Sequence, residues 1–157
     1  MFKVGDKVAY PMHGAGIIEG IEEKEILGEK RKYYVMRLPG DMKVMIPTSK
    51  VKESGLRKII DEEGVRKVFA ILSSKKDVDT TNWNHRYRNH LEKMRSGDIY
   101  EVAEVFRNLC YRQKEKGLST GERKMLENAR QILVSELVLA KDMEEEKVLT
   151  LIEKAMA

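Results

Sequence analysis

The sequence has a single cysteine and no long apolar run among its 157 residues, and each scarcity excludes a class of protein. One thiol, Cys110, cannot form an internal disulfide, so we expect a protein of a reducing compartment and not a disulfide-bonded secreted domain. No apolar stretch approaches the roughly 20 residues that a membrane helix needs. The first residues indicate the start of a folded domain, without a basic and apolar leader. These features predict a soluble, cytoplasmic protein with no membrane contact.

Groups of side chains that perform catalysis or bind metals are also missing from the sequence. His85 and His90 are five residues apart, which separates them by about 140° around a helix, and His13 lies far from both. There is no HExxH motif, no CxxC motif and no glycine-rich phosphate loop. Cys110 stands beside an apolar stripe, which favours a buried structural thiol over a nucleophile. We therefore expect no enzyme, no catalytic residue, no metal, no cofactor and no small-molecule substrate.

Charge is plentiful, and its distribution is more informative than its sum. Lys, Arg, Asp and Glu make up 36% of the residues, and the net charge is +4. Basic residues outnumber acidic ones between 83 and 130, although the whole segment from 60 to 157 is balanced. Such a basic patch permits contact with DNA but does not require it. Aromatic residues make up only 6%, so the core must be mainly aliphatic, with nine methionines as fillers.

The first part of the chain has the pattern of short strands. Residues 1–48 contain segments rich in β-branched and aromatic residues, separated by turns with glycine, proline or aspartate. Four or five such strands are too short to bury much in an open sheet. We therefore expect a small SH3- or Tudor-like β-barrel with a sharp bend at 13–16. The expected strands lie at Val4, 7–10, 16–19, 32–37 and 43–46.

From residue 61 onwards, apolar residues recur at helical spacing. About five helices are expected, with a polar loop at 73–81 and capping motifs at Asp98 and Ser119. The second of these helices, from about 82 to 95, should carry one stripe of apolar residues. That stripe consists of Trp83, Tyr87, Leu91 and Met94.

Together these patterns predict an α+β protein of two domains. A small SH3/Tudor-like β-barrel occupies residues 1–53, and an all-α domain of about five helices occupies 61–157. A linker at 54–60 joins them, so the relative placement of the domains depends on how stiff this linker is.

The start of the second expected helix is the most suggestive cluster in the sequence. Its free N–H groups form a natural phosphate site, and Arg86 and Arg88 follow within about a turn and a half. Trp83, the only tryptophan, stands in the first turn, where a flat apolar ring could wedge against a base step in the minor groove. The alternative is that Trp83 belongs to the helical core. Two basic residues near the start of the fourth expected helix are either a solvated pair or a DNA contact: Arg123 and Lys124.

Basic side chains also decorate the expected barrel. Solubility explains them, and so does a strand edge that recruits an acidic or extended partner by adding a strand. The residues alone leave both explanations open. The side chains concerned are Lys24, 30–32, Arg37 and Lys43.

One long opening segment and a series of short helical segments carry a resemblance that spans nearly the whole chain. The opening segment is VGDKVAYPMHG at 4–14. The helical segments are TNW at 81–83, RY at 86–87, LEK at 91–93, SGD at 96–98, VAEV at 102–105, GLS at 117–119 and ARQIL at 129–133. Through these segments the sequence resembles the CarD/CdnL family of bacterial transcription regulators.

This resemblance implies a Tudor-like domain that binds the first lobe of the RNA polymerase β subunit. It also implies a helical domain that meets promoter DNA at the upstream edge of the melted bubble and stabilises the open promoter complex. Members of the family have no catalytic role. We therefore expect a bacterial regulator of transcription initiation, associated with the nucleoid through RNA polymerase, whose contact with promoter DNA is largely independent of sequence.

The resemblance further implies which residues meet DNA. Trp83 falls on the wedge tryptophan of the family, and a basic cluster follows it. Further along the chain, Arg123 falls on another basic position, with Lys124 beside it. The expected DNA-binding residues are Trp83, His85, Arg86, Arg88, Arg123 and Lys124.

The polymerase-binding residues are expected on the barrel. Lys24 and Met45 fall on positions that are polymerase-facing arginines in well-known members of the family. Lys24 keeps the charge but not the planar fork of arginine, and Met45 loses the charge. Arg37 and Pro47 complete the expected polymerase-binding set.

The residues alone leave two further classes of function. A general nucleic-acid-binding module, associated with RNA or the ribosome, would bind RNA tightly without polymerase. A protein–protein adaptor without direct DNA contact would tolerate the loss of the basic cluster. An enzyme ranks below both, because the sequence contains no recognisable catalytic site.

Overall fold

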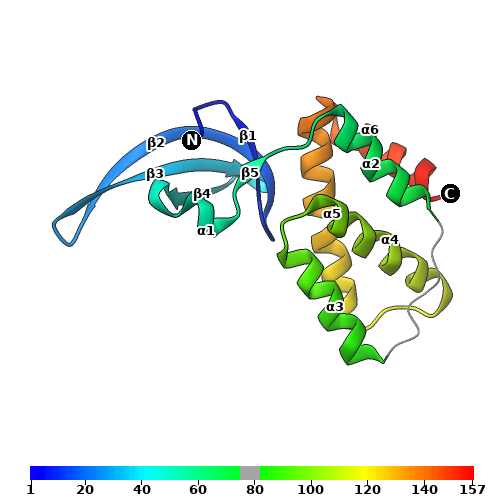
Figure 1. Cartoon of the computed structure of the whole chain (residues 1–157). Coiled ribbons are helices and arrows are strands. Elements are labelled where there is room, and N and C mark those ends of the chain that lie inside the picture. Colours follow the sequence, from blue (N-terminus) through cyan, green and yellow to red (C-terminus); the bar gives the residue numbers. More distant parts are fainter. Residues whose placement is uncertain (75–81) are drawn as a thin grey trace.

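The structure of the chain is a computed structural model that describes residues 1–74 and 82–157. It confirms the α+β class, because a five-stranded antiparallel sheet precedes the five longer helices in the chain. The curved sheet and the group of helices lie side by side (Figure 1). No helix within the two described ranges is long and apolar enough to cross a membrane.

The sheet is built from strands that pair in the order β4-β3-β2-β1-β5. A β-bulge between Ile18 and Gly20 bends β2, and such a bulge increases the local twist. Val8, Ile18 and Met36 are fully buried in the core of the sheet. In the described residues no ladder joins β4 to β5, so the sheet curls without closing into a hydrogen-bonded barrel. The strands are β1 Lys7–Tyr10, β2 Gly14–Ile26, β3 Glu29–Leu38, β4 Met42–Pro47 and β5 Arg57–Lys58.

Strands β2 and β3 form a hairpin that is longer than the sequence predicted. The expected strands at 16–19 and 32–37 are its inner part, and the pairing continues outward until Ile26 faces Glu29. The outer part is mostly polar and exposed on both faces, so it lacks the alternation of apolar residues that identifies a strand. Val4, which was expected in a strand, lies in a turn before β1.

The helical part buries a core of aliphatic side chains drawn from all five longer helices in the described residues. As predicted, Asp98 and Ser119 cap helices, and Ser119 forms a capping box with Glu122. The short helix α1, Val51–Ser54, precedes this part. The longer helices are α2 Glu62–Ser73, α3 Trp83–Arg95, α4 Ile99–Glu115, α5 Thr120–Lys141 and α6 Glu145–Met156.

The apolar stripe expected on α3 packs against the helical core except at its first residue. Met94 is buried, and Tyr87 and Leu91 are partly buried against the core, whereas Trp83 is exposed. Two polar residues of α3, Arg86 and His90, are buried as well. The helical spacing was therefore recognised correctly, but the burial of these two polar residues was not expected from the apolar pattern.

The segment expected as a linker, 54–60, is part of the packed structure, and we call it the joint. Leu56 is buried in the core of the sheet, and β5 pairs with β1. The N–H of Ile59 then donates to the carbonyl of Lys7 at 3.3 Å. Helix α5 packs directly against β2, so the sheet and the helices share an extensive contact beyond the joint.

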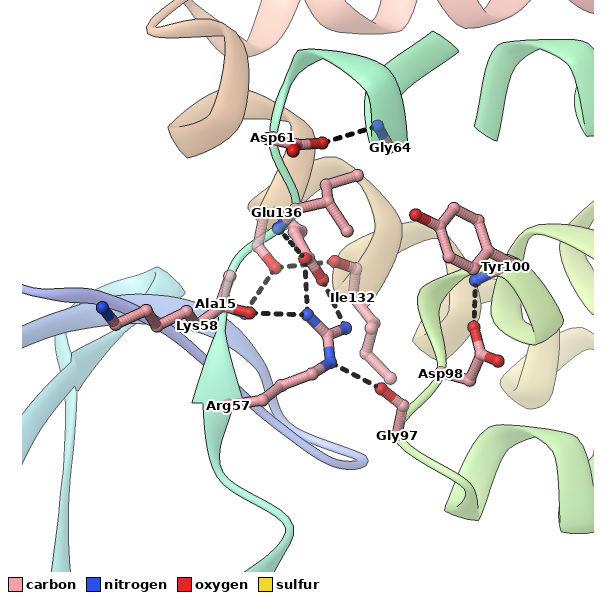
Figure 2. A network of polar contacts seen from close by, with 12 residues as sticks. Ala15, Arg57, Lys58, Asp61, Gly64, Gly97, Asp98, Tyr100, Ile132 and Glu136 are labelled. Atoms are coloured by element: carbon pink, nitrogen blue, oxygen red, sulfur yellow. Dashed lines mark hydrogen bonds and ion pairs between the residues drawn. The ribbon is translucent and has the colours of Figure 1, made fainter. Parts of the chain in front are cut away.

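A polar network fastens the joint to the helices (Figure 2). The guanidinium of Arg57 donates to both carboxylate oxygens of Glu136, at 2.7 and 2.8 Å. The same guanidinium donates to the carbonyl of Gly97 at 2.9 Å, and the N–H of Ile60 donates to Glu136 at 2.9 Å. Glu136 is 1% exposed, so this carboxylate depends on the joint for its partners.

A second contact brings the backbone of β2 close to α5. The N–H of Ala15 donates to the hydroxyl of Ser135 at 2.8 Å. Gly14 has φ of +105°, and a Cβ atom at this position would lie 2.8 Å from the Ser135 hydroxyl. Glycine is therefore required at position 14 both by its backbone conformation and by the close approach of α5.

Candidate nucleic-acid interface

Trp83 lies on the surface at the first turn of α3, which excludes the alternative that it belongs to the core. Its side chain is among the exposed large apolar groups, with 42% of the residue accessible. One face of the indole stacks on Tyr87, with 5.0 Å between ring centroids and 14° between planes. The indole N–H donates to the hydroxyl of Ser119 at 2.9 Å. Trp83 is therefore a surface aromatic ring with a defined orientation.

The first turns of α3 and α5 meet at this ring. Asn82 caps α3 by accepting a hydrogen bond from the N–H of His85 at 2.9 Å, and Ser119 caps α5. Helix N-termini carry partial positive charge, which favours anions. An open hollow beside the ring is lined by cationic residues from α3, from α4, from the residue that follows α4 and from α5, together with Glu122. The cationic residues are Arg86, Arg112, Lys116 and Arg123.

Arg86, which was also expected to contact phosphate, lines the same hollow but is buried and already paired. The residue is 4% exposed, and its guanidinium donates to Glu122 at 3.1 and 3.4 Å. Glu122 is itself 2% exposed, and Arg112 approaches it at 3.8 Å. Arg86 therefore joins α3 to α5 inside the protein. No local pattern indicates this role, because Arg86 has the charge and spacing of a surface residue.

The charge environment of Glu122 has a consequence for pH dependence. Burial alone would raise the pKa of its carboxyl, but the hydrogen bond and charge of Arg86 and the hydrogen bonds of Ser119 together hold the pKa below its usual value of 4.5. A carboxyl with a lowered pKa in the folded state contributes stability above its unfolded pKa. That contribution is lost as the pH falls through the folded pKa.

We expect Glu122→Gln to reduce stability at neutral pH and to flatten the dependence of stability on pH. The difference in free energy of unfolding between the native chain and Glu122→Gln should be constant above about pH 5 and shrink as the pH falls below 4.5. Urea unfolding across this range measures it. A difference that stays constant into strong acid would contradict the lowered pKa.

The remaining expected DNA-binding residues are exposed, but they do not all lie beside Trp83. Arg123 lines the same hollow as the ring. Lys124 lines a groove between α5 and the inner ends of β2 and β3, which Arg123 also lines. Arg88 is exposed about 140° around α3 from Trp83, and His85 is exposed in the first turn. The structure thus groups Trp83 with Arg123 and distributes the others around one end of the helical part.

The expected polymerase-binding residues share one face of the sheet. Paired residues of neighbouring strands project to the same side, and successive residues alternate. Lys24 pairs with Arg31, and Met45 and Pro47 pair with residues two and four positions before Arg37. The opposite face carries the buried core of the sheet. Lys24, Arg37, Met45 and Pro47 therefore project on the side away from that core.

Sequence reasoning missed three residues at the Trp83 site. Ser119 was recognised as a helix cap but not as the acceptor for the indole, and the capping box was the available signal. Arg112 and Lys116 come from the end of α4, and only the fold brings them to the hollow.

Among the described residues, no group of three His, Cys, Asp or Glu side chains is placed to hold a metal. Burial raises the pKa of the Cys110 thiol, which keeps this group protonated near neutral pH.

Two family models match the chain, and together they cover most of it. The model described as "CarD-like/TRCF RID domain" matches residues 2–60, and the model described as "CarD, C-terminal domain" matches residues 67–153. The first match ends with the joint, and the second begins within α2. They correspond to the sheet and to the helical part.

One curated relative and two solved structures are similar to this chain. The Bacillus subtilis (strain 168) protein named "Putative transcription factor YdeB" is 44% identical over 149 residues, which are 94% of this chain and 97% of that protein. The solution NMR structure of the 72-residue N-terminal domain of Myxococcus xanthus CarD is 39% identical. It covers 37% of this chain and 79% of its own, with a TM-score of 0.32. The structure of CdnLNt from the same organism is 46% identical, covering 40% of this chain and 89% of its own, with a TM-score of 0.35.

Proposed function

This chain belongs to the CarD family of transcription factors, and we propose that it binds RNA polymerase and stabilises the open promoter complex. The sheet contacts the first lobe of the polymerase β subunit. The helical part contacts DNA at the upstream edge of the bubble, where Trp83 acts as an apolar wedge and nearby cations bind phosphates. The separation of the two sites onto the two parts of the chain follows the division of the family models.

One observation carries the proposal for DNA: a tryptophan held in a fixed orientation on the surface, beside Arg123. An exposed aromatic ring with a defined position can insert at a distorted base step without first being ordered. Intact duplex offers the ring less contact than an opened fork. This difference in affinity shifts the equilibrium towards the open promoter, and a wedge with a few phosphate contacts can supply about 1–3 kcal/mol.

We expect Trp83→Ala to abolish the effect on promoter opening while leaving polymerase binding unchanged. Trp83→Phe, which retains a smaller ring, should keep part of the effect. A fluorescent reporter of promoter melting, with purified polymerase and the full chain, measures the first property, and co-purification with polymerase measures the second. Full activity of Trp83→Ala would refute the wedge. Tight binding to RNA without polymerase would favour a general nucleic-acid-binding module instead.

The proposed polymerase face can be tested with two methionines of the edge strand β4. Met45 projects on the proposed face, whereas Met42 pairs with the buried Leu38 and so projects on the opposite side. We expect Met45→Glu to weaken polymerase binding by about tenfold or more, because a carboxylate without a partner is costly to bury at an interface. Met42→Glu, on a residue that is 57% exposed, is the matched control and should bind normally. Equal binding by both variants would place the polymerase contact elsewhere.

A further inference from the structure

We propose that Ser119 and Glu122 are positioning residues for Trp83, and that the indole consequently offers DNA only apolar surface. The part of this inference that concerns DNA rests on the function proposed above, whereas the positioning itself does not. Three features carry it: the bonds of the Ser119 hydroxyl, the burial of Glu122 and the coverage of the indole.

The hydroxyl of Ser119 has its full set of hydrogen bonds. It accepts from the indole N–H of Trp83 at 2.9 Å and from the N–H of Glu122 at 3.2 Å. It lies 3.2 Å from a carboxylate oxygen of Glu122. A hydroxyl has one proton and two lone pairs, and an ionised carboxylate only accepts. The Ser119 proton must therefore point to Glu122, which leaves a lone pair directed at the indole.

Glu122 in turn cannot move without disturbing the helical core. Its carboxylate is buried between α3 and α5, where it accepts a hydrogen bond from the guanidinium of Arg86 at 3.1 Å. Trp83 and Arg86 are three residues apart on the same helix, so they stand on adjacent turns. The start of α3 is thus attached to the start of α5 at two points, by the Trp83–Ser119 hydrogen bond and by the Arg86–Glu122 ion pair. The orientation of the indole follows from this arrangement.

The groups that remain free on the indole are all apolar. The ring nitrogen is its only hydrogen-bond donor, and this donor is already bound to Ser119. Tyr87 covers one ring face. Gly121 of α5 lies under the edge of the ring, where a Cβ atom would be 3.7 Å from the indole. Contact with a base is therefore made by stacking or van der Waals packing, which every base accepts.

The positioning can be measured directly, because Trp83 is the only tryptophan of the chain. Ser119→Gly removes the hydroxyl at a position where glycine still serves as a helix cap. We expect it to add a fast component to the decay of tryptophan fluorescence anisotropy and to increase quenching by acrylamide by about twofold or more. Ser119→Thr keeps a hydroxyl and should restore the native decay. An unchanged decay in Ser119→Gly would overturn the inference, because stacking on Tyr87 would then suffice.

The consequence for DNA is tested with the same variants in the promoter-melting assay. Ser119→Gly should lose several-fold of the effect, and Ser119→Thr should keep it. If the indole of Ser119→Gly is mobile and this variant still has the full effect on promoter melting, a fixed orientation of Trp83 is not required. If Trp83→Ala is also fully active, the proposed function fails instead.

A second arm varies the base pair at the upstream fork through all four possibilities. If the indole contacts DNA through apolar surface alone, the effect of the native chain on promoter melting should agree within about twofold among the four base pairs. A preference above about tenfold for one base pair, removed by Trp83→Phe, would show a directional hydrogen bond from the indole and overturn this inference.

Discussion

Replacing Arg57 with alanine should lower the free energy of unfolding by about 3 kcal/mol, because the change leaves a buried carboxylate with too few partners. Glu136 would lose both bonds from the guanidinium and keep the N–H of Ile60. The carbonyl of Gly97 would also lose its donor. The side chain of Arg57 is 32% exposed, which places the expected loss at the lower end of the range for buried ion pairs. Urea unfolding followed by circular dichroism measures it.

Two variants serve as controls for this loss. Arg31, in the exposed hairpin, pairs with Glu29 at 3.1 Å, and its side chain is 53% exposed. Arg31→Ala should therefore cost less than about 1 kcal/mol. Glu136→Gln keeps the shape of the side chain and lets Arg57 turn towards water, so it should cost less than Arg57→Ala. Equal losses for Arg57→Ala and Arg31→Ala would show that the ion pair does not hold the joint.

Arg86→Ala should be at least as damaging, with an expected loss of about 3–5 kcal/mol. Both members of its ion pair with Glu122 are buried, with side chains 5% and 3% exposed. Removing the guanidinium leaves Glu122 with Arg112 at 3.8 Å and the hydrogen bonds of the capping box. The exposed Arg88 on the same helix provides the comparison, because Arg88→Ala should change stability by less than about 0.5 kcal/mol.

The two arginine variants also separate two explanations of the basic cluster. If Arg86 is structural, Arg86→Ala lowers DNA affinity only in proportion to the loss of folded protein. Arg88→Ala should instead weaken binding alike for all DNA sequences and reduce its dependence on salt. If Arg86→Ala is as stable as the native chain but binds DNA poorly, Arg86 contacts DNA directly, and the buried ion pair with Glu122 is contradicted.

Local signals in the sequence were sufficient for the class of fold and for much of its segmentation. Glycine- and proline-containing turns separated the strands, and the change from a period of two to a helical period marked the second part. The capping box of Ser119 predicted the start of α5 within one residue. These features depend on neighbours within about four residues, which a sequence displays directly.

The features that the sequence did not reveal depend on partners far along the chain. Arg57 and Glu136 are 79 residues apart, and Arg86 and Glu122 are 36 apart. Each of these residues has the polarity of a surface position, and only the fold supplies the partner that allows its burial. The same limit explains why Arg86 and His90 were not expected among the buried residues of α3. It also explains why the sequence left the stiffness of 54–60 open.

The packed joint determines how the two proposed contacts reinforce each other. A flexible chain of seven residues, the length of 54–60, would let its ends sample separations around roughly 15 Å, and the helical part would find DNA over a wide volume. The joint allows one separation and one orientation. The local concentration of the tryptophan is then high at one place relative to the bound polymerase and negligible elsewhere. With the two contacts proposed above, the protein is expected to respond to the position of the fork relative to the polymerase as well as to its presence.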